Sequence, residues 1–129
     1  MTRRAGVILR NRRLYRAQRA QSNGVCFYCG RYIYKWQQVD GHRMPEDAIT
    51  IDHVYPETGR RYYPDDAAWL AANRVECCQE CNLIKGRIDP LDWLVIMPSN
   101  EGAERLATLL LGHLWVPEDD VKSAMRRRK

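Results

Sequence analysis

The chain has no apolar run long enough to cross a membrane. Its longest such stretch, LATLLLGHLWV at 106–116, has eleven residues and contains a histidine, whereas a spanning helix needs about 20 apolar residues. Near the start, AGVIL is too short for the core of a signal peptide and is followed at once by arginine. These absences argue against an integral membrane protein, and we expect a cytoplasmic location.

Acidic side chains are absent from residues 1–25. All sixteen acidic residues lie in 26–125 beside ten basic ones, a net charge of −6, while the chain as a whole carries +5. Two cationic ends on an acidic body favour a polyanionic partner, most simply DNA bound through its phosphates; the alternative is solvated tails. The C-terminal block is RRRK, and the arginines of the first block are Arg3, Arg4, Arg10, Arg12, Arg13, Arg16 and Arg19.

Four of the five cysteines form two C-x-x-C pairs, CFYC and CQEC. In a reducing cytoplasm this spacing favours metal binding over disulfides. Tetrahedral Zn²⁺ takes four thiolates, and a two-residue gap allows each turn to supply two; such a closed site has no open position for chemistry. Cys77 is one residue out of step and is expected to be a buried apolar residue. The predicted ligands of the structural zinc are Cys26, Cys29, Cys78 and Cys81.

Polar residues suited to catalysis lie between and beside the cysteine pairs. TIDHVYP is a predicted strand that carries Asp52 and His53, Asn73 precedes a second strand, and Asn82 follows the last cysteine. Carboxylate and amide oxygens suit Mg²⁺, and a neighbouring histidine can take a proton from water, so the set favours metal-assisted phosphodiester hydrolysis. The structural alternatives are a backbone-bonded His53, a turn residue at Asn73 and a helix N-cap at Asn82.

Hydrophobic spacing and cap residues predict the secondary structure. Tyr32, Tyr34 and Trp36 are expected on one face of a strand. No internal repeat or low-complexity linker is present, so a single domain is expected. The predicted helices are 5–20, 65–74, 79–87, 89–97, 100–116 and one after Pro117, and the predicted strands lie within 25–36, 48–56 and 74–77.

The segments CFYCG, TIDHVYP and NRVECCQECNLIKG resemble, in this order and spacing, the HNH endonucleases. The resemblance covers roughly residues 26–90. It implies an α+β fold with a zinc-stapled ββα-metal (HNH) core, here flanked by an N-terminal basic helix and C-terminal helices. The expected divisions of the single domain are a basic helical arm at 1–25, the core at 26–90 and a helical extension at 91–129.

The resemblance implies a role for each candidate residue. Asp52 and Asn82 would bind the catalytic metal, His53 would activate the attacking water, and Asn73 would hold the His53 ring in position. Asn82 stands where the family often has histidine, which favours Mg²⁺ or Mn²⁺ over softer metals. The implied activity is DNA cleavage to 5′-phosphate and 3′-hydroxyl ends, in a bacterium or a phage-infected cell.

Other assignments stay open at this point. Arg60 and Arg61, in the loop after the Asp-His strand, and Lys85, one turn beyond the last asparagine, are candidate DNA contacts. The stretch 106–116 either covers the core or forms the surface of a homodimer. The alternatives to a nuclease are a zinc-stabilised DNA-binding module without catalysis and a zinc domain that binds another protein.

Overall fold

Two small β-sheets and a group of helices make up the part of the chain that the computed structural model describes, residues 13, 15–38, 40–57 and 63–128. The α+β prediction is therefore confirmed as mixed helix and sheet. None of the described helices is long and apolar enough to span a bilayer. The elements are β1 (Gly24–Val25), β2 (Tyr32–Ile33), β3 (Ile49–His53), α2 (Ala67–Ala72), β4 (Arg74–Cys78), α3 (Gln79–Lys85), α4 (Pro90–Ile96), α5 (Asn100–His113) and α6 (Glu118–Arg127).

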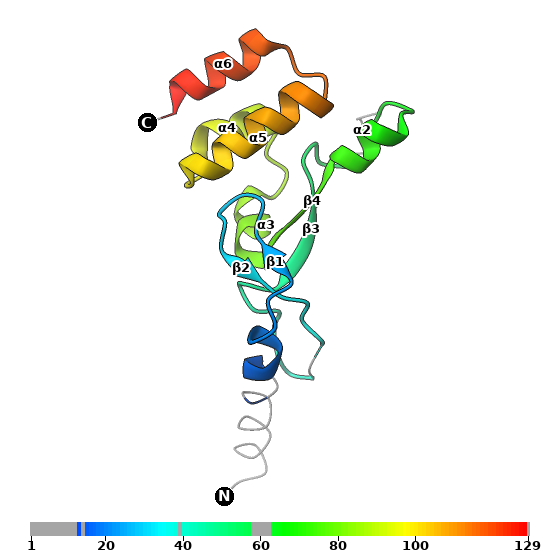
Figure 1. Cartoon of the computed structure of the whole chain (residues 1–129), viewed down its shortest axis with the longest axis vertical. Helices are drawn as coiled ribbons and strands as arrows, with labels where there is room; N and C mark the ends of the chain where they lie inside the picture. The colour runs from blue at the N-terminus through cyan, green and yellow to red at the C-terminus, as the bar shows by residue number, and fades with distance from the viewer. Residues whose placement is uncertain (1–12, 14, 39, 58–62, 129) are drawn as a thin grey trace, which may run out of the picture.

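The second sheet and the helix that follows it form the centre of the molecule (Figure 1). β3 and β4 pair antiparallel, in a register that sets Asp52 opposite Val75. α3 follows β4 directly, with Cys78 as its N-cap, and ends at Gly86. The φ of Gly86 is +51°, in the region where glycine is favoured, so the helix can stop there without strain.

Asp52 and the neighbouring isoleucines of β3 lie on different sides of the strand. Asp52 is on the buried side, at 5% exposure, whereas Ile51 is 43% exposed. A carboxylate can be buried where it finds hydrogen-bonding and charged partners, and Tyr28 and Lys85 supply them. Alternation along the strand was read correctly, but the sequence does not show which face has the partners.

The strand after the first cysteine pair is shorter than predicted. β2 ends at Ile33, and Tyr34 makes only an isolated bridge to Ala48, because its carbonyl accepts from the Ile49 amide at 2.8 Å. The three aromatic residues therefore do not share one face of a strand. Tyr32 is 77% exposed, whereas Tyr34 is buried.

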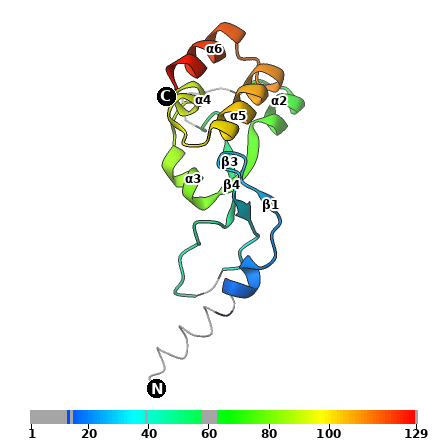
Figure 2. The same ribbon diagram turned by 60° about the vertical axis from the view of Figure 1, so that its left-hand side comes forward.

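The three C-terminal helices pack together at the end of the molecule opposite to the described helical residues 15–19 (Figures 1 and 2). α5 begins at a cap, since the Ser99 hydroxyl accepts from the Gly102 amide at 3.0 Å. Within 106–116 one face covers the core and Trp115 is exposed. The buried side chains of this region include Trp93, Leu94, Met97, Leu106, Leu110 and Leu114.

A close approach of two backbones joins α5 to the first cysteine pair. A Cβ added at Gly102 would lie 1.7 Å from the carbonyl oxygen of Tyr28. We expect Gly102→Ala to lower the free energy of unfolding by about 3 kcal/mol, because backbone on both sides must shift. Chemical denaturation of the variant checks this value.

The matched control lies in the same helix. A Cβ at Gly112 meets no atom within 4 Å, so Gly112→Ala should stabilise the protein by about 0.5–1 kcal/mol through helix propensity alone. Equal denaturation midpoints for the two variants would show that α5 is not in close backbone contact with the first cysteine turn.

Candidate metal centre and adjoining cavity

The four predicted cysteines come together, and that prediction is confirmed. Their sulfur atoms all lie within 4.8 Å of one another. Cys29 Sγ and Cys78 Sγ are 3.8 Å apart, the spacing that ligands about 2.3 Å from a tetrahedral zinc ion would have, about 3.8 Å. The cluster could therefore hold a metal ion, and its geometry and donor type are compatible with zinc.

Backbone amides shape both cysteine turns. The Cys29 amide donates to Cys26 Sγ at 3.4 Å, and the Cys81 amide donates to Cys78 Sγ at 3.3 Å. Such bonds favour the thiolate form that a metal requires. The Phe27 amide also donates to the Glu76 carbonyl at 3.0 Å, which fastens the first turn to β4.

Hydrogen bonds between the clustered sulfur atoms shift the pKa values of individual cysteines in opposite directions. Hydrogen bonds with Cys78 and Cys81 lower the pKa of Cys26, and the bond to Cys26 raises the pKa of Cys78 to about 12. A bound divalent cation would favour the thiolate form of the cysteines, so this mostly buried cluster is suited to cation binding.

Cys77 stays outside the cluster, as predicted. It is fully buried beside Thr50, and burial raises its pKa to about 12. A neutral thiol packed in the core acts as a small apolar side chain.

A small open cavity of about 200 Å³ lies beside the strand that carries Asp52 and His53. Asn82 reaches the same cavity from α3, so these three predicted residues are brought together. The cavity lining comprises Ile51, Asp52, His53, Pro56, Glu57, Asn82, Gly86 and Arg87.

The Asp52 carboxylate is held from behind the cavity. Oδ2 accepts from the Tyr28 hydroxyl at 2.5 Å and lies 3.1 Å from Lys85 Nζ. Burial, reinforced by the charge of Asp52, raises the pKa of Tyr28, so its hydroxyl remains a donor. Both of these contacts use the same oxygen, Oδ2.

His53 ends β3 with its side chain 36% exposed. Its Nε2 lies 3.8 Å from a carboxylate oxygen of Glu57, which follows in the irregular segment after the strand. The imidazole therefore lines the cavity and is partly exposed, and the Glu57 carboxylate lies beside it.

Asn73 is buried and bonds to backbone rather than to the His53 ring. Its Oδ1 accepts from the Tyr55 amide at 2.7 Å, its Nδ2 donates to the Tyr55 carbonyl at 3.3 Å, and its own carbonyl accepts from the Val54 amide at 2.8 Å. These three bonds hold the segment that leaves His53. Asn73 thus holds the backbone after the histidine, and its role toward the His53 ring stays a prediction.

Asn82 lies inside α3, so the helix N-cap alternative is wrong. Its Nδ2 donates to Thr50 Oγ1 at 2.9 Å, and Thr50 in turn donates to the Cys77 carbonyl at 3.0 Å. These bonds fix the side-chain amide of Asn82 through its nitrogen.

The prediction that Lys85 contacts DNA is wrong. Its side chain is fully buried, with Nζ 3.1 Å from Asp52 Oδ2 and donating to the His53 carbonyl at 3.1 Å. An ammonium group placed between an aspartate and a carbonyl is stabilised there, and it cannot reach a phosphate.

The other basic candidates are only partly described. Arg13, Arg16 and Arg19 lie in or beside the described helical turn, and Arg19 forms an ion pair with Asp47 at 2.9 Å. Arg3, Arg4, Arg10, Arg12, Arg60 and Arg61 lie outside the described residues.

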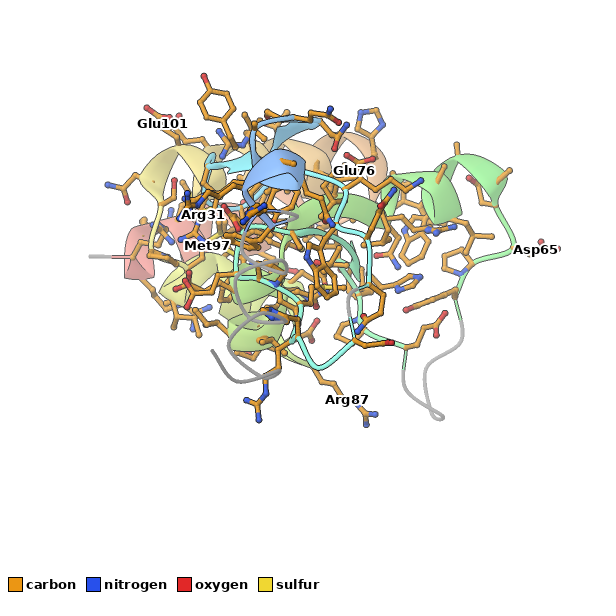
Figure 3. All side chains as sticks on the ribbon, turned by 90° about the horizontal axis from the view of Figure 1, so that it is seen from below. Arg31, Asp65, Glu76, Arg87, Met97 and Glu101 are labelled. Carbon is orange, nitrogen blue, oxygen red and sulfur yellow. The ribbon has the colours of Figure 1, made fainter. Side chains whose placement is uncertain are left out.

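Sequence reasoning missed Arg87, which lines the cavity and points away from the body of the molecule (Figure 3). Its place directly after the helix-ending Gly86 was the available signal. No known family model, curated protein or solved structure matches the chain. Function must therefore be inferred from the cavity, which gathers groups able to take a proton, hold a cation and contact an anion.

Proposed function

We propose that the protein is a metal-dependent DNA endonuclease of the HNH type. The observation that carries the proposal is that Asp52, His53 and Asn82 line one open cavity, although 28 residues lie between the last two in the chain. An antiparallel strand pair followed by a helix, with a four-cysteine cluster beside it, is also what a zinc-stapled ββα-metal core would have.

Two metal sites belong to this proposal. The four cysteines would hold a structural Zn²⁺, because four clustered thiolates suit that ion. Asp52 Oδ1 and Asn82 Oδ1 would hold the catalytic ion, for which oxygen donors favour Mg²⁺ or Mn²⁺. When bound, this ion supplies positive charge to the scissile phosphate and to the leaving 3′ oxygen.

The remaining steps use side chains of the chain itself. His53 takes a proton from the water that attacks phosphorus, and Glu57 stabilises the imidazolium that results. Arg87, at the edge of the cavity, contacts a phosphate oxygen. The bond between phosphorus and the 3′ oxygen breaks, the leaving oxygen takes a proton from solvent, and the products are a 5′-phosphate and a 3′-hydroxyl.

The charge distribution supports DNA as the substrate. The first 25 residues carry seven arginines and no acid, and the chain ends in RRRK. Such blocks bind phosphates by releasing counterions, without regard to base sequence. Recognition of a particular sequence is not required by this proposal.

The test is cleavage of supercoiled, linear and branched DNA with added Mg²⁺, with added Mn²⁺ and with neither, in buffers free of chelator so that the cysteine cluster is undisturbed. Cleavage is expected only with added metal. Intact DNA in all three buffers would rule out the nuclease.

One observation favours a second candidate, a zinc-stabilised DNA-binding module without catalysis. Lys85 and Tyr28 already compensate the Asp52 charge, which weakens the attraction of that carboxylate for a cation. Under this alternative a gel shift would be seen at moderate salt, with no cleavage under any metal condition.

A further inference from the structure

A buried polar cluster lies behind the cavity, made of Tyr28, Asp52 and Lys85. Their relative exposures are 1%, 5% and 0%. Burying an aspartate and a lysine costs free energy unless both are paired and hydrogen-bonded. Here each polar end has a partner, so the cluster fixes the carboxylate in one orientation.

The cluster connects segments that are remote in sequence. Tyr28 lies inside the first C-x-x-C turn, Asp52 on β3, and Lys85 at the end of α3, which begins beside the second cysteine pair. Lys85 also donates to the His53 carbonyl. The elements that carry the cysteine cluster are thus the ones that hold Asp52 and the backbone of His53.

The Tyr28 ring is itself fixed on its other sides. It packs edge-on against Trp93 with ring centroids 5.5 Å apart, and the Tyr28 carbonyl touches Gly102 of α5. A tyrosine held by a helix, by a cysteine turn and by its hydroxyl cannot easily move away from the carboxylate.

We propose that Tyr28 and Lys85 are positioning residues that hold Asp52 Oδ2, turn Oδ1 toward the cavity, and thereby make the cysteine cluster part of the framework of the active site. The reactive role of Asp52 rests on the proposed nuclease function. The orientation of its carboxylate does not, so the two can be tested separately.

The first experiment needs no catalytic metal. In full-length, zinc-loaded protein without Mg²⁺ or Mn²⁺, Tyr28→Phe is expected to shift the ¹³C resonance of the Asp52 carboxyl carbon while one zinc per chain is retained. The matched control is Tyr34→Phe, since Tyr34 is equally buried and the Asp52 carboxylate bonds to Tyr28 and Lys85 instead. An unmoved Asp52 resonance in Tyr28→Phe would overturn the proposal.

The second experiment uses Lys85. Lys85→Met leaves Asp52 without its cation and is expected to lower the unfolding midpoint, and the double variant Asp52→Asn/Lys85→Met should recover much of that loss, because neither group is then charged. Recovery supports the pairing. A single variant as stable as the parent, or a double variant no better than the single one, would contradict it.

The third experiment rests on the nuclease function. Tyr28→Phe should lower kcat about tenfold and weaken Mn²⁺ binding by a similar factor, with KM for DNA unchanged, as is usual when a group that orients a metal ligand is removed. Mn²⁺ binding is measured by calorimetry without DNA. If the parent cleaves no DNA, the nuclease proposal fails, while the carboxyl resonance still decides the role of Tyr28; unchanged kcat and Mn²⁺ affinity in a cleaving protein would remove that role.

Discussion

Replacing His53 with alanine is expected to lower the cleavage rate by at least about a hundredfold and to leave DNA binding intact. The imidazole lines the cavity, and a neutral imidazole can accept a proton from water. Its side chain is partly exposed, so its removal leaves no cavity in the core and no buried partner unsatisfied. The loss should therefore fall on kcat, measured by single-turnover cleavage of plasmid DNA.

The control for this variant is His113→Ala. His113 is the exposed last residue of α5 and does not line the cavity beside His53. Its removal should leave cleavage at the parental rate, with binding of both variants measured by fluorescence anisotropy in Mg²⁺-free buffer. Parental cleavage by His53→Ala would contradict the assignment of His53 as the base.

Cys78→Ala is expected to abolish stoichiometric zinc binding and to unfold the central part of the protein. Structural zinc in small domains contributes about 10–16 kcal/mol of apparent binding free energy, which is also folding free energy. Cys78 has three structural roles, because it is the last residue of β4, the N-cap of α3 and a member of the cluster. Zinc content per chain and thermal unfolding followed by circular dichroism measure the two effects.

The adjacent cysteine offers a close control. Cys77 is equally buried but lies outside the cluster, so Cys77→Ala should keep one zinc per chain and lose only about 1 kcal/mol of stability. Removing zinc from the parent with a strong chelator should reproduce the unfolding of Cys78→Ala. Equal zinc content in the two alanine variants would mean that the cluster is not a metal site.

Local signals predicted much of the secondary structure correctly. Asp66 and Ser99 accept from backbone amides at the starts of α2 and α5, and Pro90 occupies the first turn of α4. Each signal acts within a few residues of the end that it marks. The predicted length of the strand that contains β2 was wrong. Tyr34 pairs with Ala48, a residue distant in sequence, and this contact decided where the strand ends.

Some residues in and behind the cavity were predicted correctly and others were not, again because only some signals are local. Asp52, His53 and Asn82 were found because their side-chain chemistry and spacing are informative on their own. Lys85 was misassigned because a lysine on a short helix is usually solvated, and only its neighbours show otherwise. Tyr28 was not singled out at all, since nothing in CFYC indicates that its hydroxyl meets an aspartate 24 residues later.

The amino-acid sequence by itself determined which four cysteines form the cluster, most helix ends and the identity of the polar residues beside the cavity. These follow from spacing and side-chain chemistry, which are local properties. Tertiary structure alone decided that Asp52 faces inward, that Lys85 is buried against it and that Arg87 borders the cavity. The reason is physical: the free energy of a buried charge depends on which partners the rest of the fold places within hydrogen-bonding distance.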